Sequence, residues 1–293
     1  MEYVSCNLMG GLGNQLFQIF ATIAYSMKYN CKFVFEYTKE LNIGITRSTF
    51  WDTFLTELLQ YTTKGNNNTI ISPYLNSFPK YRESGFHYTK IPEITNTQFI
   101  SLFGYFQSYK YFEDQWQHIQ HIINLPVKRK NLMDDYSMLF KDCYTISMHF
   151  RMGDYKKKQN YHPIMTLEYY EKALQYIISM INIIEHDTVS KVIYFCEKED
   201  NEDVRIIIES LSQQHPTIIF IKADDNISDW KQMLLMSCCQ SNIIANSSFS
   251  WWGAYMNDNE NKFVCYPEKW FGPAAGERNM NDLFPDRWNK IKL

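Results

Sequence analysis

The second half of the chain alternates regularly between short apolar runs and amphipathic stretches, and this alternation constrains the fold more than any other feature. Buried strands are expected at 144–150, 191–196, 217–222, 242–245 and 262–266. Helices are expected between them, at 166–182, 203–213, 229–239 and 249–257. Strands that alternate with helices build right-handed βαβ units, so this half predicts an α/β fold with a parallel, doubly wound sheet.

The first half opens in the same way. A strand is expected at 3–8, followed by a glycine-rich turn and a helix, and further strands are expected at 31–36 and 99–108. Residues 44–92 show little periodicity and are assigned to helices and loops. The best domain boundary is Pro126 with the polar, basic residues after it. We therefore expect two Rossmann-like domains, residues 1–130 and 131–293, that face each other across a cleft.

Charge and cysteine content exclude several classes of protein. The net charge of −3 provides no general basic field for nucleic acid. Seven cysteines without a Cys-x-x-Cys pair indicate reduced thiols in a cytosol-like compartment. The N-terminus shows no basic leader, and no segment reaches about 18 uninterrupted apolar residues. We expect a soluble, cytoplasmic protein without a membrane span, and the sequence carries no signal for an oligomeric state.

A His, an Arg and an Asp leave the end of the strand at 144–150 together. They are His149, Arg151 and Asp154, in the heptad 149–155. Open α/β sheets bind their ligands at the carboxyl ends of strands, and an Arg fork suits two oxygens of a diphosphate. Taken alone, the heptad is equally consistent with an ordinary strand end that carries solvated charges.

The glycine-rich turn at 10–15 is a second candidate site. Its backbone N–H groups, at Gly11, Leu12 and Gly13, can approach an anion or a sugar closely, and Asn14 is placed to cap the following helix. The glycine spacing does not match a dinucleotide fingerprint, and no Gly-Lys-Ser/Thr follows as in a P-loop. An NAD-dependent oxidoreductase, which the double Rossmann-like rhythm suggests, is therefore disfavoured.

A third turn, 246–253, joins the strand at 242–245 to a helix. Ser248 or a neighbour can cap that helix, whose free N–H groups and dipole favour an anion. The hydroxyls of Ser247, Ser248 and Ser250 would add neutral donors. A serine-capped helix with two core tryptophans is the simpler interpretation of this motif alone. In an interdomain cleft, the three turns could converge on one ligand that carries a diphosphate and a sugar.

Together the motifs resemble those of glycosyltransferase family 11, the α-1,2-fucosyltransferases. The matching segments are 10–18, 104–108, 149–155, 162–163 and 246–253, in the order of that family and over nearly the whole chain. The resemblance implies a GT-B fold with GDP-β-L-fucose as donor. It also implies inversion at the anomeric carbon and an α-1,2-fucoside on a galactose-type acceptor.

The resemblance also implies roles for single residues. Arg151 would contact the diphosphate, with His149 beside the nucleotide-sugar. Asp154 would orient Arg151 or bind the guanosine side, and Asn14 would lie near the glycosidic oxygen or the acceptor. The donor-binding residues implied at the third turn are Asn246, Ser247, Ser248 and Phe249, which complement Gly11, Leu12 and Gly13.

Two departures from the family pattern bear on the donor. The family usually carries two successive arginines, whereas Met152 follows Arg151 here. Where the family tends to show Ser-Asp-Asp, this chain has Cys-Glu-Lys-Glu-Asp at 196–200. One alternative is therefore a transferase for another nucleotide-activated deoxyhexose. The other is a non-catalytic nucleotide-sugar or glycan-binding protein with the same fold.

No two aspartates stand two positions apart, so the Asp-x-Asp motif that holds a divalent metal in many transferases is missing. We expect a metal-independent reaction without a cofactor, in which Arg151 and helix N-termini stabilise the departing diphosphate. The sequence leaves the general base open among several side chains. These are His149, Asp154, His162, Glu197 and Glu199.

Overall fold

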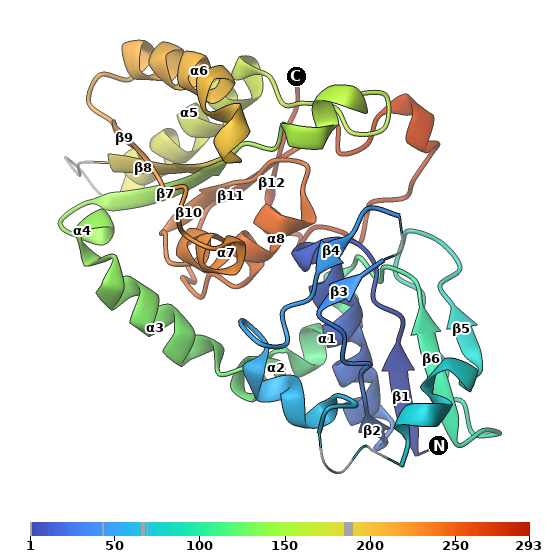
Figure 1. Cartoon of the computed structure of the whole chain (residues 1–293). Coiled ribbons are helices and arrows are strands. Elements are labelled where there is room, and N and C mark those ends of the chain that lie inside the picture. The colour runs from blue at the N-terminus through green and yellow to red at the C-terminus, as the bar shows by residue number, and fades with distance from the viewer. Residues whose placement is uncertain (1, 43, 66–67, 69, 185–189) are drawn as a thin grey trace. The chain divides into compact units, whose positions relative to one another are not determined.

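The structure is a computed structural model that describes residues 2–42, 44–65, 68, 70–184 and 190–293 (Figure 1). The chain divides into two compact units. Unit 1 comprises Met1–Val127 and Arg278–Pro285, and unit 2 comprises Lys128–Glu277 and Asp286–Leu293. The expected second domain ran without interruption to the end of the chain, whereas the structure returns 278–285 to unit 1. Asp282 anchors this return, because its backbone carbonyl accepts the Ser108 hydroxyl at 2.6 Å and its carboxylate pairs with Lys110.

Unit 1 is built on a parallel four-stranded sheet of order β2-β1-β6-β5. Its strands are β1 (Tyr3–Cys6), β2 (Lys32–Phe33), β5 (Lys80–Arg82) and β6 (Phe99–Phe103). Helix α1 (Leu12–Lys28) lies against β1 and β2 and fully buries Leu16, Phe20 and Ile23, which recur at helical spacing. The expected strands at 3–8, 31–36 and 99–108 are present in shortened form.

The segment expected to hold only helices and loops contains short strands as well. β3 (Glu40–Leu41) and β4 (Arg47–Ser48) form an antiparallel pair, and β5 extends the main sheet. The sequence gives no signal for β5, because its three residues are polar or aromatic rather than an apolar run. Among the described residues of this unit, helical turns also occur at η1 (Thr56–Tyr61), η3 (Ser72–Ser77), η4 (Tyr109–Tyr111), η5 (Glu113–Gln115) and α2 (Trp116–Ile122).

The chain passes from unit 1 to unit 2 between Val127 and Lys128, at the boundary expected after Pro126, and the backbone there is helical. Helix α3 (Leu125–Asp135) begins just before this proline and is followed by α4 (Ser137–Phe140). Proline is tolerated there, because the first turn of a helix has no intrahelical acceptor for its N–H groups.

Unit 2 confirms the predicted parallel, doubly wound sheet, with strand order β12-β11-β10-β7-β8-β9. The strands are β7 (Tyr144–His149), β8 (Ser190–Phe195), β9 (Ile219–Lys222), β10 (Ser241–Ile243), β11 (Val264–Pro267) and β12 (Asn289–Ile291). The expected series ended at β11 and lacked β12, a three-residue edge strand. The helices are α5 (Leu167–Ile184), α6 (Asn201–Gln214), α7 (Asp229–Ser237) and α8 (Ser248–Tyr255).

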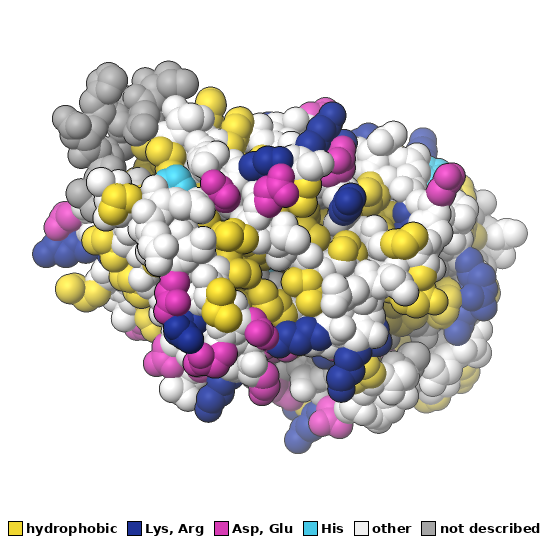
Figure 2. All heavy atoms as spheres, turned by 90° about the horizontal axis from the view of Figure 1, so that it is seen from above, with side chains coloured by type: hydrophobic (Ala, Val, Ile, Leu, Met, Phe, Trp, Pro, Cys, Tyr) yellow, Lys and Arg dark blue, Asp and Glu magenta, His cyan; other side chains and the backbone are white. Residues whose placement is uncertain are grey.

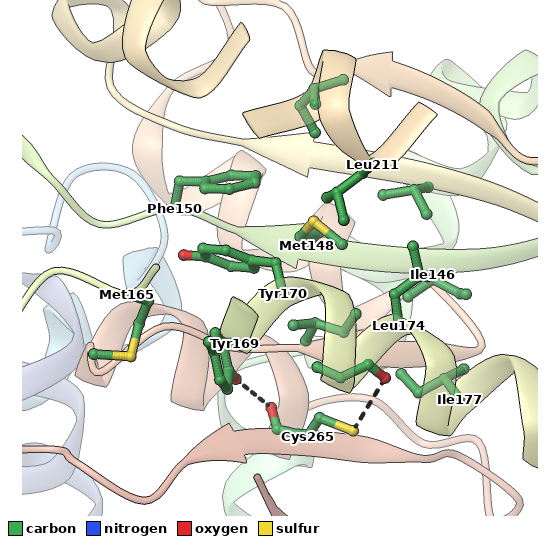
Figure 3. Close-up of a cluster of buried hydrophobic side chains, with 14 of the residues drawn as sticks. Ile146, Met148, Phe150, Met165, Tyr169, Tyr170, Leu174, Ile177, Leu211 and Cys265 are labelled. Atoms are coloured by element: carbon green, nitrogen blue, oxygen red, sulfur yellow. Dashed lines mark hydrogen bonds between the residues drawn. The ribbon is translucent and has the colours of Figure 1, made fainter. Parts of the chain in front are cut away.

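Helices cover both faces of this sheet, with α5 and α6 on one side and α7 and α8 on the other (Figure 1). Two tyrosines of α5, Tyr169 and Tyr170, are buried in this core (Figure 3), and both also bond to strand ends. The Tyr170 hydroxyl donates to the His149 carbonyl at 3.0 Å, and the Tyr169 hydroxyl donates to the Ile244 carbonyl at 2.5 Å. Buried tyrosines need such partners, and these two fix the carboxyl ends of β7 and β10.

Candidate active site

Each sheet has a topological switch point, where the chain reverses the direction in which it adds strands. In unit 2 this point lies between β7 and β10, and in unit 1 it lies between β1 and β6. Ligands of open α/β sheets bind outside the carboxyl ends of the strands at such points. The turn 149–155 follows β7, the turn 246–253 follows β10, and the turn 10–15 follows β1. All three sequence motifs therefore flank a switch point.

Arg151 is held between carboxylates from two different turns. Its guanidinium donates to Asp154 at 2.5 Å and to Glu197, which lies in the turn after β8. Its guanidinium carbon also lies 5.0 Å from the centre of the Tyr155 ring. Burial acts to lower the pKa of Arg151, but Glu197, Tyr155 and Asp154 raise it, so the side chain is a permanent cation.

Gly153 and Asp200 shape the turn that carries Arg151. Gly153 has φ +33°, and a Cβ there would stand 2.4 Å from Glu197 Oε2, so only glycine leaves room for this carboxylate. The Gly153 N–H donates to the buried Asp200 at 2.7 Å, and Asp200 also pairs with Lys156 at 2.7 Å. Asp200 is thus a structural anchor that sequence reasoning missed.

His149 is the buried residue at the end of β7. Burial, together with the Arg151 charge, lowers its pKa to about 3, so the imidazole is neutral near pH 7. Its ring centre lies 5.5 Å from that of Phe249. Among the described residues, His149 Nδ1 is one of a few buried side-chain atoms without a hydrogen-bond partner. Such an atom at a switch point is suited to a polar group of a ligand.

The turn after β10 combines a helix cap with a second unsatisfied atom. The Ser247 hydroxyl accepts the Phe249 N–H at 3.3 Å and caps α8, as predicted for Ser248 or a neighbour. Asn246 donates to the carbonyls of Pro163 and Trp270 at 2.9 and 3.1 Å, while its Oδ1 is buried without a partner. Ser248 and Phe249 are half-buried at the start of the helix.

Ser250, Trp251 and Trp252 of this turn are all buried. Ser250 does not add a donor for a ligand, because it is fully buried and its hydroxyl faces the backbone carbonyls of Ala245 and Ser247. The interpretation of Trp251 and Trp252 as core residues is confirmed, since both are completely buried.

His162 and Glu199 are the remaining candidate bases. His162 stacks on the Tyr155 ring with centres 4.6 Å apart, and Glu199 is exposed in the turn before α6.

In unit 1, the glycine-rich turn differs from its predicted form. Helix α1 already begins at Leu12 with Gly11 as N-cap, so Asn14 lies inside the first turn and does not cap the helix. Leu12 and Gly13 are buried there, whereas Gly11 is half-buried. Gly10 has φ +76°, and a Cβ there would lie 2.5 Å from Asn14 Nδ2. The glycine thus allows both the left-handed turn and the close approach of the Asn14 amide.

Two buried glutamines, which sequence reasoning did not single out, hold this turn in place. Gln18 accepts the Met9 N–H at 2.9 Å and donates to the carbonyls of Met9 and Asn14. Gln15 donates to the carbonyls of Gly10 and Ser48, both at 2.9 Å. In the sequence, the signal for this role was a pair of glutamines, three residues apart, directly after a glycine-rich turn.

The turns after β1 and β6 meet across the switch point of unit 1. Gln107, in the segment 104–108, donates to Asn14 Oδ1 at 2.7 Å. The Ser101 hydroxyl donates to Asn7 Oδ1 at 3.0 Å and joins the same two strands. The orientation of the Asn14 amide is therefore set by a residue 93 positions away.

In the described residues, surface charge, metal-ligating groups and helix hydropathy do not extend the candidate site beyond these turns. On the face in Figure 2, acidic and basic side chains are interspersed among the described residues. The described part of the chain contains no group of three or more His, Cys, Asp or Glu arranged to hold a metal ion. None of its helices is long and apolar enough to cross a bilayer.

Two parallel α/β units with ligand-type turns at both switch points are the architecture of the GT-B fold. POFUT1 in complex with GDP has this fold, with a TM-score of 0.52, 11% identity and coverage of 90% of this chain and 98% of that one. Arabidopsis thaliana FUT1 in complex with GDP gives 0.51, with 10% identity over 97% of this chain and 74% of that one. The chain belongs to glycosyl transferase family 11, whose model matches residues 3–292.

Two curated relatives match nearly the whole of this chain. An alpha-1,2-colitosyltransferase of Escherichia coli is 27% identical over 100% of both chains. A galactoside 2-alpha-L-fucosyltransferase of Caenorhabditis elegans is 24% identical over 97% of this chain and 77% of that protein. The chain is therefore a glycosyltransferase by family, and its relatives are named for two different sugars.

Proposed function

We propose that this protein transfers L-fucose from GDP-β-L-fucose to the 2-hydroxyl of a galactose-type acceptor, with inversion and without a metal ion or cofactor. The observation that carries the proposal is the Arg151 guanidinium at the β7–β10 switch point. A planar, permanently charged fork at a strand end suits a diphosphate. The family membership and the named fucosyltransferase relative support the sugar and the linkage.

The chemistry follows from the charge that develops on the leaving group. As the glycosidic bond breaks, negative charge grows on the diphosphate, and Arg151 and the N-terminus of α8 stabilise it. The neutral His149 and the Asn246 amide oxygen offer unsatisfied polar atoms to the rest of the donor. The acceptor hydroxyl attacks from the opposite face as GDP leaves, and its proton passes to one of the candidate bases or to a phosphate oxygen of the departing GDP.

The relative named as a colitosyltransferase favours a second candidate donor, GDP-L-colitose. Colitose is L-fucose without its 3-hydroxyl, so the two donors differ by one polar group. A site that hydrogen-bonds this hydroxyl would reject colitose strongly, by about 10⁴-fold, because its own polar groups would be left unpaired. A site lined by apolar atoms at this point would discriminate only about 10²-fold or less.

A donor panel tests the proposal. The purified protein is incubated with a galactoside acceptor, EDTA and one donor at a time, chosen from GDP-fucose, GDP-colitose and several UDP- and dTDP-sugars. We expect transfer from GDP-fucose, with a mass gain of one fucosyl residue and an α-1,2 linkage by NMR. Transfer from GDP-colitose alone would shift the proposal to the second donor. GDP binding without any transfer would identify a non-catalytic binding protein instead.

A further inference from the structure

Glu83 is a carboxylate in unit 1 that the reaction above does not use. It directly follows β5, and its Oε2 accepts two backbone N–H groups of the turn after β6, from Tyr105 at 2.8 Å and from Phe106 at 3.0 Å. Burial raises its pKa, while these two N–H groups and the Tyr111 hydroxyl act in the opposite direction. A half-buried acid that binds two consecutive backbone N–H groups fixes the path of that backbone.

The turn that Glu83 binds has a backbone of unusual shape. Phe106 has φ +51°, which is uncommon for a residue with a side chain, and its ring is completely buried edge-on against Tyr111 at 5.2 Å. A Cβ on Gly104 would lie 2.4 Å from Glu83 Cβ and 2.5 Å from its Oε2. Strained backbone of this kind persists only where several contacts hold it, and Glu83 supplies two of them.

The same turn delivers the side chain that orients Asn14. Gln107 follows Phe106 directly and donates to Asn14 Oδ1 at 2.7 Å. With its oxygen turned toward Gln107, the Asn14 amide has its nitrogen on the side of Gly10. A continuous chain of contacts thus runs from Glu83 through the backbone of 105–107 to the Asn14 amide.

We propose that Glu83 is a positioning residue for glycosyl transfer, which acts by fixing the turn 104–107 so that Gln107 holds the Asn14 amide in its working orientation. This role rests on the proposed function and on the family resemblance, which implies that Asn14 lies near the glycosidic oxygen or the acceptor. Glu83 itself touches neither substrate in this account. Its loss should lower turnover and leave the binding of GDP, which is assigned to unit 2, unchanged.

The test compares Glu83→Ala, Glu83→Gln and Gln107→Leu with the wild type and with Glu36→Ala, an exposed glutamate of unit 1. The kcat of transfer and the Kd for GDP are measured for each folded protein. We expect Glu83→Ala and Gln107→Leu to lower kcat by about 10- to 100-fold, as for a small displacement of a reacting group. Glu83→Gln should stay within about threefold, because its amide oxygen still accepts both N–H groups.

The double variant tests whether Glu83 acts on Asn14 through Gln107. If Glu83 acts through Gln107, combining Glu83→Ala with Gln107→Leu should add little to either single loss. Additive losses would overturn the proposal, and so would a Glu83→Ala enzyme with wild-type kcat. A Glu83→Gln variant as slow as Glu83→Ala would also overturn it, since the carboxylate would then act as an acid or base.

The same variants also test the proposal if Glu83→Ala does not fold or if the wild type transfers no sugar. If Glu83→Ala does not fold, the other two single variants decide. The proposal is supported if Gln107→Leu is slow, Glu83→Gln is fast and both bind GDP as the wild type does. Any other pattern contradicts it. If the wild type transfers no sugar from any donor, the proposed function fails by itself. The contact chain is then tested by crystal structures, where Glu83→Ala should lose the Gln107–Asn14 hydrogen bond, and its retention would contradict the chain.

Discussion

At the scale of single residues, the central feature is a cation whose partners are already in place. Arg151 contacts Asp154 within its own turn and Glu197 from the turn after β8. A diphosphate that binds Arg151 must share or replace at least one of these carboxylates. Glu197 is the more exposed partner, with 47% of its side chain accessible against 35% for Asp154, so it is the easier one to displace.

Removal of the Arg151 fork should cost most of the activity. We expect Arg151→Ala to lower kcat by roughly two orders of magnitude or more, since one charge-assisted contact to a leaving group supplies about 3–4 kcal/mol in a water-poor site. Arg151→Lys should recover only part of this loss, because an ammonium cannot bind two oxygens in the plane of a fork. Arg205→Ala, which removes an exposed arginine of α6, is the control in the same steady-state assay. Wild-type kcat in Arg151→Ala would remove this residue from the mechanism.

Glu197 should compete with the diphosphate. Glu197→Gln is expected to tighten GDP binding by about two- to fivefold in low salt, the size of an exposed ion pair. Glu202→Gln removes the same charge from α6, where it contacts Arg205, and controls for long-range electrostatics. Isothermal titration calorimetry with GDP measures both variants. Weaker binding in Glu197→Gln alone would show that Glu197 holds Arg151 ready rather than opposing the ligand.

His149 should make stability depend on pH. Its pKa of about 3 in the folded protein lies below the value of about 6.5 in the unfolded chain, so only the unfolded chain gains this proton between the two. Stability is therefore lost as pH falls, by about 1.4 kcal/mol between pH 7.5 and 5.5 for this group. Urea unfolding at both pH values should show a steeper loss for the wild type than for His149→Gln. Equal slopes would contradict a buried, neutral imidazole.

At the scale of elements, turns rather than helices or strands carry the site. In the glycine-rich turn of unit 1, Gly10 adopts the left-handed conformation, and Gln15 and Gln18 hydrogen-bond to backbone carbonyls of the turn. Helix α1 starts two residues after Gly10. The turn after β10 keeps its shape through the Ser247 cap and the Asn246 side chain. Each turn thus has buried amide side chains where a loop would otherwise leave backbone groups unpaired.

Gly10 and Gly11 provide a matched test of the glycine-rich turn of unit 1. Gly10→Ala should lower the free energy of unfolding by about 1–2 kcal/mol, because φ is +76° and the new Cβ meets the Asn14 amide. Gly11→Ala should leave stability within about 0.5 kcal/mol, since no atom lies within 4 Å of its Cβ position. Urea denaturation compares the two variants. Similar stabilities would contradict the left-handed conformation of Gly10.

The sequence predicted the elements of unit 2 well and the contacts within the sites poorly. Runs such as 144–150 and 191–196 are long and apolar, so their burial is visible in the sequence. The strands β5 and β12 have three residues each and lie at sheet edges, where no apolar run is required. The Gln107–Asn14 bond joins residues 93 positions apart and depends on the strand order, which local patterns do not encode.

At the scale of the whole molecule, each unit is built on one main sheet, and the two main sheets share a design. Both are parallel, and both place their sequence motifs at a switch point between non-consecutive strands. The segment 278–285 returns to unit 1 before β12 completes the sheet of unit 2, so the chain passes between the units more than once. Unit 1 presents neutral amide groups at its switch point, and unit 2 presents a cation and a helix N-terminus. This division suits a sugar acceptor and a nucleotide diphosphate, respectively.

The most direct test of the account is a crystal structure of the protein with GDP. We expect diphosphate oxygens to lie within hydrogen-bonding distance of the Arg151 guanidinium, beyond the carboxyl ends of β7 and β10, with at least one carboxylate displaced from the arginine. A GDP molecule whose phosphates bind elsewhere, with Arg151 still paired to both Asp154 and Glu197, would contradict it.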